Sequence, residues 1–517
     1  MTGLEKLVHI HPGSHRALRR YLTPFYCFAL GLMLILALIS CDRKATATPN
    51  LTTVTQSGNL SHATSPALFG TQALIKSTRT PLPAIPATPN ERTPSPLGVM
   101  AADLTGLQVN LWHPWTGATG TDFQTILDDF NRTNKWGITV VANAYEGFGS
   151  LDEAVDSALT SSTLPDVLVD YGYQARHWNE SGVLADLAPY VDDPVWGLTG
   201  GEQSDFYPSF WAEDLVTTVS PPNSLRLGIP YYRSAYVLFY NQSWADELGY
   251  PVPPITVEDF RLQACAAAES VSVQGDKTNL GKGGWLITSE PGTLAGWIYA
   301  FGGEITNPNG NGYLFNTPET IQAFDYLKGL EESGCAWVDT GLEARADFAH
   351  RQGLFMVSSL FDIPSQRAAF TQAGLVDEWV VIPFPSNTQP VVDTYGPSIL
   401  VTRSTPAKQL ASWLVIEWLV YPPNQAEFVG QLEVYPTRQS TLRYLTNSEI
   451  TSSQWEQALK LLPDSRGEPS LASWNMVRWV LNDATAQLFS LQFKSDKIPL
   501  LIENLDNVAE EIFRKVH

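Results

Sequence analysis

Short apolar segments alternate with amphipathic ones along most of the chain, and this alternation predicts the fold class. Residues 107–112 alternate apolar and polar side chains, which is typical of a half-buried strand. Residues 138–141 and 166–169 predict two more strands, and 151–159 predicts a helix between them. In residues 122–133 the apolar side chains fall on one helical face: Phe123, Ile126, Leu127 and Phe130. Strands that alternate with helices predict an α/β fold with a parallel sheet, which binds ligands beyond the carboxyl ends of its strands.

The first 40 residues have the pattern of an export signal. Arg16, Arg19 and Arg20 precede an apolar run over residues 25–39. A run of about 15 apolar residues is shorter than the about 20 that a stable membrane span needs. We therefore expect residues 1–40 to be a cleaved signal peptide.

The apolar run ends in Leu38-Ile39-Ser40-Cys41, which resembles the bacterial lipobox. This resemblance implies cleavage before Cys41 and a diacylglyceryl group on its thiol. Two or three acyl chains exceed the single-chain limit for marginal, reversible anchoring. We expect an exported protein that is lipid-anchored on the extracytoplasmic side of a bacterial membrane. The alternative is an ordinary signal peptide without a lipid.

Residues 41–105 have the composition of a tether. Ser, Thr and Pro occupy 25 of the 64 positions after Cys41, and Phe69 is the only aromatic residue among them. Such a segment cannot bury enough apolar surface to offset its ordering entropy. All sixteen Trp lie at Trp112 or later, so we expect the folded part to begin near Gly106.

The charge of the chain argues against nucleic-acid binding. Its formal net charge is −21, and it becomes −24 without residues 1–40, which carry four basic side chains and one acidic one. Such a surface repels phosphate backbones and anionic lipid heads. Alternatively, the negative charge only keeps the protein soluble, and in that case it gives no information about the ligand.

Two cysteines lie in the part that we expect to fold. Cys265 and Cys335 could form a disulfide that closes a 71-residue loop. In the chain-entropy model this bridge would stabilise the protein by about 4 kcal/mol. The alternative is a pair of unrelated buried thiols.

Several fragments follow one another in the order of a known family. Examples are Leu164-Pro165-Asp166-Val167, Gly228-Ile229-Pro230-Tyr231-Tyr232, Gly302-Gly303-Glu304-Ile305 and Tyr435-Pro436-Thr437-Arg438. Each is weak alone, but together they span residues 106–517 and resemble the family 1 extracellular solute-binding proteins, the maltose- and oligosaccharide-binding group. The chain departs from the family pattern at Val257, where Trp is usual after the Thr of a helix-start turn.

The resemblance implies a two-lobe periplasmic-binding-protein fold of type II, with hinge strands and a ligand cleft. We expect lobe I over residues 106–236 and 398–436, and lobe II over 237–397 and 437–517. The cleft closes on a small solute because both lobes contact it only when shut. The implied protein is a monomeric lipoprotein that delivers a sugar or oligosaccharide to the membrane subunits of an ABC importer. It needs no cofactor or metal and is not an enzyme.

Sugar binding requires flat aromatic rings and a polar rim. By the resemblance, Trp474 falls on a Trp that stacks on ligand in maltose-type binders. Other candidates follow predicted strand ends or lie near the crossing between lobes: Trp112, His113, Asp170, Tyr171, Tyr232, Arg233, Glu290, Trp297, Phe361, Asp362 and Tyr395. We assign Trp413 and Trp418, in an apolar helix, to the core.

Other functions were weighed against solute binding. The Gly-x-Ser-x-Gly, His-Glu-x-x-His and Cys-x-x-Cys motifs are absent from the sequence. A surface lipoprotein glycoside hydrolase stays an alternative, because its carboxylate pair is defined by separation in space. A second alternative keeps the fold but binds a polyamine or a glycerol phosphate ester, or serves as a sensor.

Overall fold

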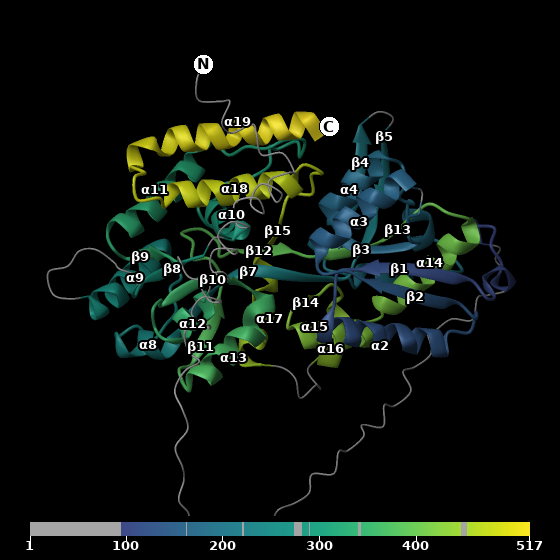
Figure 1. Ribbon diagram of the computed structural model, residues 1–517, viewed down its shortest axis with the longest axis horizontal. Helices are drawn as coiled ribbons and strands as arrows, with labels where there is room; N and C mark the ends of the chain where they lie inside the picture. The colour runs from purple at the N-terminus through teal and green to yellow at the C-terminus, as the bar shows by residue number, and fades with distance from the viewer. Residues whose placement is uncertain are drawn as a thin grey trace, which may run out of the picture. The chain divides into compact units, whose positions relative to one another are not determined.

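The structure is a computed structural model that describes residues 95–516, apart from 162, 220–221, 273–281, 289, 340–342 and 446–451 (Figure 1). The expected signal peptide over residues 1–40, the lipidation site Cys41 and most of the tether therefore lie outside the described residues.

Lobe I is built on a mostly parallel sheet with the strand order β2-β1-β3-β13-β6. Strand β1 runs parallel to β2 and β3, whereas β13 runs antiparallel to β3 and β6. Helices α3 and α4 cover one face of this sheet, and α2 and α14 cover the other (Figure 1). Its elements are η2 (Ala101–Leu104), β1 (Gln108–His113), α2 (Gly117–Thr133), β2 (Thr139–Ala144), α3 (Phe148–Ser161), β3 (Val167–Tyr171), α4 (Gly172–Glu180), α5 (Ala188–Val191), α6 (Gly200–Ser204), α7 (Pro208–Glu213), the hairpin β4 (Leu215–Val219) and β5 (Pro222–Arg226), β6 (Gly228–Pro230), β13 (Pro397–Val401), α14 (Pro406–Leu419), α15 (Pro422–Leu432), η4 (Gln439–Thr441) and α16 (Leu442–Leu445).

Lobe II is built around the long strand β7, which pairs with β10, β11, β12 and β14. The sheet continues through β10, β8 and β9 on one side, and through β12 and β15 on the other. Helices α10, α18 and α19 lie on one side of it, and α12, α13 and α17 lie on the opposite side (Figure 1). Its elements are β7 (Tyr232–Asn241), α8 (Gln242–Glu247), α9 (Val257–Val271), β8 (Trp285–Ile287), α10 (Pro291–Ala300), α11 (Pro318–Glu332), β9 (Ala336–Val338), α12 (Ala344–Ala349), β10 (Phe355–Ser359), η3 (Leu360–Asp362), α13 (Ile363–Ala373), β11 (Trp379–Ile382), β12 (Val392–Tyr395), β14 (Tyr435–Pro436), α17 (Ser453–Lys460), η5 (Leu462–Asp464), β15 (Ser465–Gly467), α18 (Trp474–Leu488), η6 (Ser495–Lys497) and α19 (Ile498–Val516).

The sequence patterns produce these elements in the expected way. The four apolar residues predicted on one helical face are all buried in α2. The predicted strand over 107–112 is β1, which has alternating burial because one face packs on the core. Thr256 begins α9 by accepting from the Asp259 backbone N–H, while the Asp259 side chain accepts from Thr256. This capping box starts the helix although Val257 replaces the usual Trp.

The chain crosses between the lobes at β6–β7 and at β12–β13. Only Tyr231 separates β6 from β7, and only Gly396 separates β12 from β13. A Cβ atom on Gly396 would lie 2.4 Å from the Tyr232 carbonyl oxygen, so this close approach of two backbones requires glycine.

Two of the expected lobe boundaries are displaced. Strand β7 belongs to the lobe II sheet from Tyr232 onward, so the expected change at residue 236 is too late. Residues 439–445, as η4 and α16, pack on α15 of lobe I, so the expected change at residue 436 is too early. The first change comes earlier because β7 is one continuous strand of the lobe II sheet from Tyr232, and the second comes later because η4 and α16 pack on α15.

The expected end of the tether at residue 105 is also wrong. Val99 and Leu104 are buried against the lobe I core, and η2 contacts α14. The Ser95 hydroxyl donates to an Asp193 carboxylate oxygen at 2.6 Å. Three apolar residues within eight positions, the third being Leu97, give this segment enough surface to pack.

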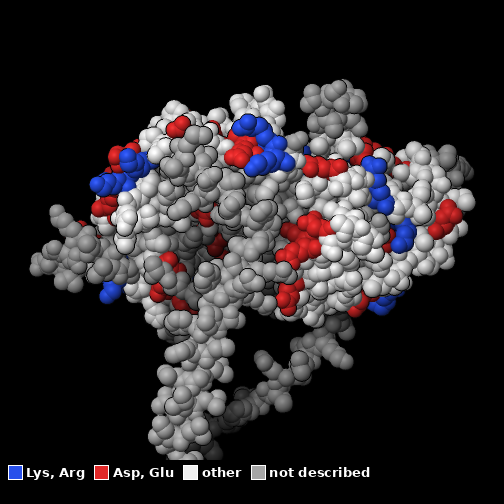
Figure 2. Space-filling view, turned by 45° about the horizontal axis from the view of Figure 1, so that its top comes forward, with Lys and Arg blue, Asp and Glu red and all other residues white. Residues whose placement is uncertain are grey.

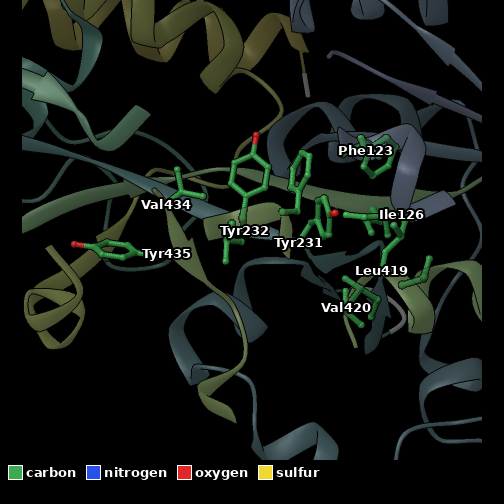
Figure 3. Packing of buried hydrophobic residues seen from close by; sticks show 14 of the residues in the cluster. Phe123, Ile126, Tyr231, Tyr232, Leu419, Val420, Val434 and Tyr435 are labelled. Carbon is green, nitrogen blue, oxygen red and sulfur yellow. The ribbon is translucent and has the colours of Figure 1, made fainter. Parts of the chain in front are cut away.

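A dense apolar cluster lies beneath the crossing strands (Figure 3). It brings Phe123 and Ile126 of α2 next to Tyr231 and Tyr232 at the start of β7. Phe428 of α15 stacks on Tyr231 with 5.2 Å between ring centroids. Trp413 and Trp418 are buried in the same cluster, as predicted.

Cys265 of α9 and Cys335, just before β9, form a disulfide. It fastens a helix to the edge of the lobe II sheet.

We predict that the double substitution Cys265→Ser/Cys335→Ser lowers the free energy of unfolding by about 4 kcal/mol, because the unfolded chain regains the entropy of an open loop. Denaturant unfolding with and without a reductant measures this change. The wild-type protein under reductant should approach the variant, and the variant should not respond to reductant. Equal stability of both proteins without reductant would contradict the prediction.

Candidate functional site

The carboxyl ends of strands from both lobes converge on the crossing strands, and we call this region the interlobe junction. Strand β3 of lobe I ends there at Tyr171, and β10 of lobe II ends there at Ser359. Strand β12 ends at Tyr395 immediately before it crosses. This is the edge at which α/β sheets bind ligands.

Four tyrosines line up across the interlobe junction as two stacked pairs that meet at a tilted contact, and we call this row the tyrosine ladder. Tyr236 of β7 stacks on Tyr395 with ring centroids 4.7 Å apart. Tyr395 lies 6.5 Å from Tyr171, which stacks on Tyr173 at 5.1 Å with an interplanar angle of 11°. The first two rings belong to lobe II and the last two to lobe I. Tyr171 and Tyr395 remain partly exposed, whereas Tyr173 and Tyr236 are buried.

Packing and hydrogen bonds hold the ladder in place. The Tyr395 hydroxyl lies 2.7 Å from the Ser359 hydroxyl, which lies 2.9 Å from that of Ser234. Gly292, in the first turn of α10, lies against the Tyr236 ring so closely that a Cβ atom would overlap it. The lobe II half of the ladder, Tyr236 and Tyr395, is therefore held in one position.

Helix α18 of lobe II reaches lobe I through two side chains. Arg478 Nη1 donates to the Tyr173 hydroxyl at 2.9 Å, and Asn475 Nδ2 donates to Gln174 Oε1 at 3.0 Å. Arg478 also pairs with Glu468 at 3.6 Å. These contacts join the two lobes beside the ladder.

Two carboxylates lie on the lobe II side of the ladder. Asp362 Oδ1 accepts from Arg345 at 3.1 Å, and its Oδ2 accepts from the Ser358 hydroxyl at 2.9 Å. Glu290 precedes α10 and is exposed, and its side chain makes no capping hydrogen bond. Its pKa is raised, first because the surrounding protein partly desolvates the carboxylate and second because of the Asp362 charge, while Arg478 opposes the rise.

A separate cavity of about 370 Å³ also lies between the lobes, and this volume suits a small solute. Arg176 of α4 contributes the lobe I wall, and the Arg466 guanidinium lies over the Tyr299 ring at 4.3 Å and pairs with Glu304. Its lining residues are Arg176, Tyr299, Glu304, Thr306, Gly310, Arg466, Gly467, Glu468, Pro469, Ser470 and Leu471. Sequence reasoning missed this cavity, because these residues come from distant segments without a common motif.

Two of the predicted ligand-binding tryptophans lie in the core instead. Trp297 is fully buried among aromatic rings, including Phe260 at 5.0 Å, so its side chain is a packing element. Trp474 is also fully buried, and its Nε1 donates to Glu468 Oε2 at 2.9 Å. The reason for both corrections is that Trp297 points into the rings of α9 and β8, and Trp474 lies against Tyr313, so neither side chain reaches solvent.

Four further predicted residues are buried and have structural partners. Asp170 accepts from the Tyr171 backbone N–H at 2.7 Å, and burial raises its pKa, with a further rise from the Asp152 charge. Arg233 is bound within the crossing strands. His113 and Tyr232 also lie in the core. Buried side chains do not offer a binding surface, so we correct these expectations.

The other candidates lie at the surface of the interlobe junction or near it. Trp112, Tyr171, Phe361, Asp362 and Tyr395 are partly exposed, and Glu290 is exposed. Two ladder members, Tyr173 and Tyr236, and the bridging Arg478 were not predicted as site residues. Arg478 lies four residues beyond the predicted Trp474, so helical spacing could have indicated it, whereas Tyr173 lies only two residues beyond Tyr171 at a strand end.

Several acidic side chains gather near the middle of the face shown in Figure 2, while basic side chains lie nearer its edges. Among the described residues, no group of three or more His, Cys, Asp or Glu side chains is arranged to hold a metal ion. In the same part of the chain, no helix has the length and apolar character that crossing a membrane requires.

Comparisons with known proteins agree with this architecture. The sequence profile of the bacterial extracellular solute-binding proteins matches residues 125–458. A Brucella abortus (strain 2308) protein named for a proposed binding role is 22% identical over 381 residues, which are 72% of this chain and 86% of the relative.

Solved structures match the fold over nearly their whole length. The cyclic alpha-maltosyl-1,6-maltose binding protein of Arthrobacter globiformis gives a TM-score of 0.66 at 16% identity and covers 79% of this chain and 99% of its own. The sugar-binding protein MalE of Xanthomonas citri gives a TM-score of 0.66 at 20% identity, and the match covers 79% of this chain and 98% of MalE. UgpB of Mycobacterium tuberculosis, in complex with glycerophosphocholine, gives a TM-score of 0.61 at 18% identity, and the match covers 79% of this chain and 98% of UgpB.

The two lobes, their crossing strands and the interlobe junction define a maltose-binding-like periplasmic binding fold, as predicted. Because the profile spans more than half of the chain, the protein belongs to the bacterial extracellular solute-binding protein family. It is thus a solute-binding protein that acts outside the cytoplasm.

We predict that His113 makes the protein less stable in acid. Burial lowers the pKa of its imidazole to about 4, from 6.5 when exposed. Above pH 6.5 the His113 imidazole is neutral in both the folded and the unfolded protein. Between pH 6.5 and 4 it takes up a proton only in the unfolded protein. The free energy of unfolding should therefore fall by about 3 kcal/mol across this window.

Denaturant unfolding at pH 7 and pH 4.5 tests this, with His113→Asn as the comparison. The variant should lose less stability between the two pH values than the wild type. Parallel losses would show that the imidazole titrates normally in the folded protein.

Proposed function

We propose that the protein captures a sugar or oligosaccharide at the interlobe junction and delivers it to the membrane subunits of an ABC importer. The observation that carries this proposal is the tyrosine ladder, which extends from Tyr236 in lobe II to Tyr173 in lobe I. Sugars pack their C–H faces on aromatic rings and direct their hydroxyls to charged and amide groups. The interlobe junction supplies both.

The geometry also supports binding that is coupled to closure. Tyr171 and Tyr395 come from different lobes and lie 6.5 Å apart, so a solute on both rings contacts both lobes. Such a solute stabilises the closed arrangement over any open one, because it makes more contacts there. An importer can then recognise the loaded protein by its shape.

The names of similar structures support a sugar as the first choice. Proteins that bind a cyclic maltosyl-maltose, other sugars and glycerophosphocholine share this fold. We place the chain among the sugar binders because its interlobe junction combines ring faces with polar rim groups. The two alternative solutes from the sequence, polyamines and glycerol phosphate esters, belong in the same binding screen.

We further propose that the mature protein begins at a lipidated Cys41 and works as a monomer on the outer side of a membrane. Residues 1–40 supply the export signal, and residues 42–94 supply the tether. The lipobox-like sequence Leu38-Ile39-Ser40-Cys41 supports lipidation, because it places a cysteine thiol directly after the expected cleavage point.

We predict that Tyr395→Ala weakens binding of the best sugar found in a thermal-shift screen by about 1–2 kcal/mol, because the central ring of the ladder is lost. Isothermal titration calorimetry measures the change. Tyr444→Ala is the matched control, because Tyr444 is 48% exposed and lies in α16, outside the ladder. Equal affinity of the Tyr395 variant and the wild type would remove the ladder from the binding site.

We predict that Cys41→Ser releases the protein from the membrane fraction, since the thiol that would carry the lipid is gone. Cell fractionation with detergent partitioning shows where the protein resides, and Cys27→Ser is the control within the signal. A membrane-bound Cys41→Ser protein would mean that another feature anchors the chain.

A further inference from the structure

Helices α18 of lobe II and α4 of lobe I meet away from the crossing strands, where one end of α18 lies next to α4 (Figure 1). Asn475 Nδ2 of α18 donates to Gln174 Oε1 of α4 at 3.0 Å. Arg478 Nη1, one turn further along α18, donates to the Tyr173 hydroxyl at 2.9 Å. We call these two hydrogen bonds the α18–α4 latch. The chain itself joins the lobes at the crossing strands, whereas the latch can break when the lobes separate.

The acceptors of the latch are held in place within lobe I. Gln174 is 2% exposed, and its amide also forms a hydrogen bond with the Asp152 carboxylate of α3. Tyr173 is buried and stacks on Tyr171 at the end of β3. Hydrogen bonds to such shielded and oriented groups compete little with water, so they contribute to the closed arrangement of the lobes.

The donors of the latch are held in place within lobe II. Trp474 Nε1 donates to Glu468 Oε2 at 2.9 Å, and Glu468 pairs with Arg478 at 3.6 Å. Asn475 directly follows the buried Trp474 in the first turn of α18. Trp474 therefore orients both donors before they meet lobe I. Preorganised partners lose little conformational entropy when they form a contact.

The packing beside the latch is loose. The cavity of about 370 Å³ lies between Arg176 of α4 and residues 466–471 of lobe II. The cost of separating two surfaces grows with the apolar area that becomes exposed. Beside a cavity this area is small, so the two hydrogen bonds supply much of the resistance to opening at this place.

We infer that the α18–α4 latch controls the rate at which the lobes open, and thereby the rate at which a bound solute is released. This inference rests on the proposed function, because release by opening presupposes a solute between the lobes. Asn475 and Gln174 are then positioning residues, which act through the closed arrangement and not through contact with the solute. A hydrogen bond of ordinary strength corresponds to about fivefold in an equilibrium constant.

Double electron–electron resonance on the full chain without solute tests whether the latch holds the lobes. Spin labels on p-acetylphenylalanine at the exposed positions Ser157 of α3 and Asn507 of α19 leave the native cysteines unlabelled. They report opening, because α3 packs on α4 and α19 packs on α18. We expect a shorter, latched distance and a longer, open one. Asn475→Ala and Tyr173→Phe should each raise the ratio of open to latched protein about fivefold, and the double variant about 25-fold.

Gln487→Ala is the matched control, because Gln487 is an exposed amide of the same helix, about three turns beyond Asn475. It should leave the distance distribution unchanged. Thermal unfolding of each variant checks that it is folded. A double variant with the same distance distribution as the wild type would overturn the inference.

Stopped-flow tryptophan fluorescence measures solute release, with maltose and maltotriose as the probes. We expect Asn475→Ala to release both sugars about fivefold faster and to bind them no more slowly, because the latch must break before the solute leaves. An equal factor for two sugars of different length is the mark of a positioning residue, since a residue that contacts the solute would distinguish them. Unequal factors would overturn the inference.

The outcomes separate this inference from the proposed function. If the sugars bind but the variants match the wild type in distances and release, the latch is overturned and sugar binding stands. If the distances change while release does not, the inference is also overturned, because opening then does not control release. If no sugar of the thermal-shift screen binds, the proposed function and the release step both fail, while the distances still show whether the latch holds the lobes.

Discussion

The two lobes are held in register by one buried guanidinium at the crossing strands. Arg233, 1% exposed, donates from Nη1 to the carbonyl oxygens of Tyr232 and Pro397, both at 2.8 Å. Its Nε donates to Glu213 at 2.8 Å, and Nη2 reaches the Ser398 hydroxyl. One side chain thus joins β7, β13 and the end of α7. A buried charge is stable only when its donors are satisfied, and here the crossing backbones satisfy them.

This constraint determines where a solute can bind. Arg233 and Gly396 fix both crossings. Tyr395, the last residue of β12, therefore lies beside Tyr236 and near Tyr171 at the end of β3. The ladder is thus a consequence of strand order, since β3, β7 and β12, which are distant in sequence, bring Tyr171, Tyr236 and Tyr395 together. The crossing strands can flex as a hinge, while each lobe keeps its own part of the ladder on rigid strands.

The sequence predicted the architecture well and the site only in part. Helix and strand periodicity identified the elements of lobe I, because one face of each must be buried whatever the tertiary detail. The choice between core and ligand surface was much harder. Trp297 and Tyr395 both follow the expected pattern, yet only the second remains partly exposed. That difference depends on the rings of α9 and β8 that surround Trp297, which no local pattern encodes.

Trp474 illustrates how a residue can serve the site without touching a solute. Its indole N–H holds Glu468, Glu468 pairs with Arg478, and Arg478 donates to the Tyr173 hydroxyl at 2.9 Å. This chain of contacts leads from the core of lobe II to a ladder ring of lobe I. Each member orients the next, so the buried Trp474 positions Tyr173 from a distance. The family resemblance predicted that Trp474 stacks on ligand, but its ring is buried and its indole N–H donates to the Glu468 carboxylate.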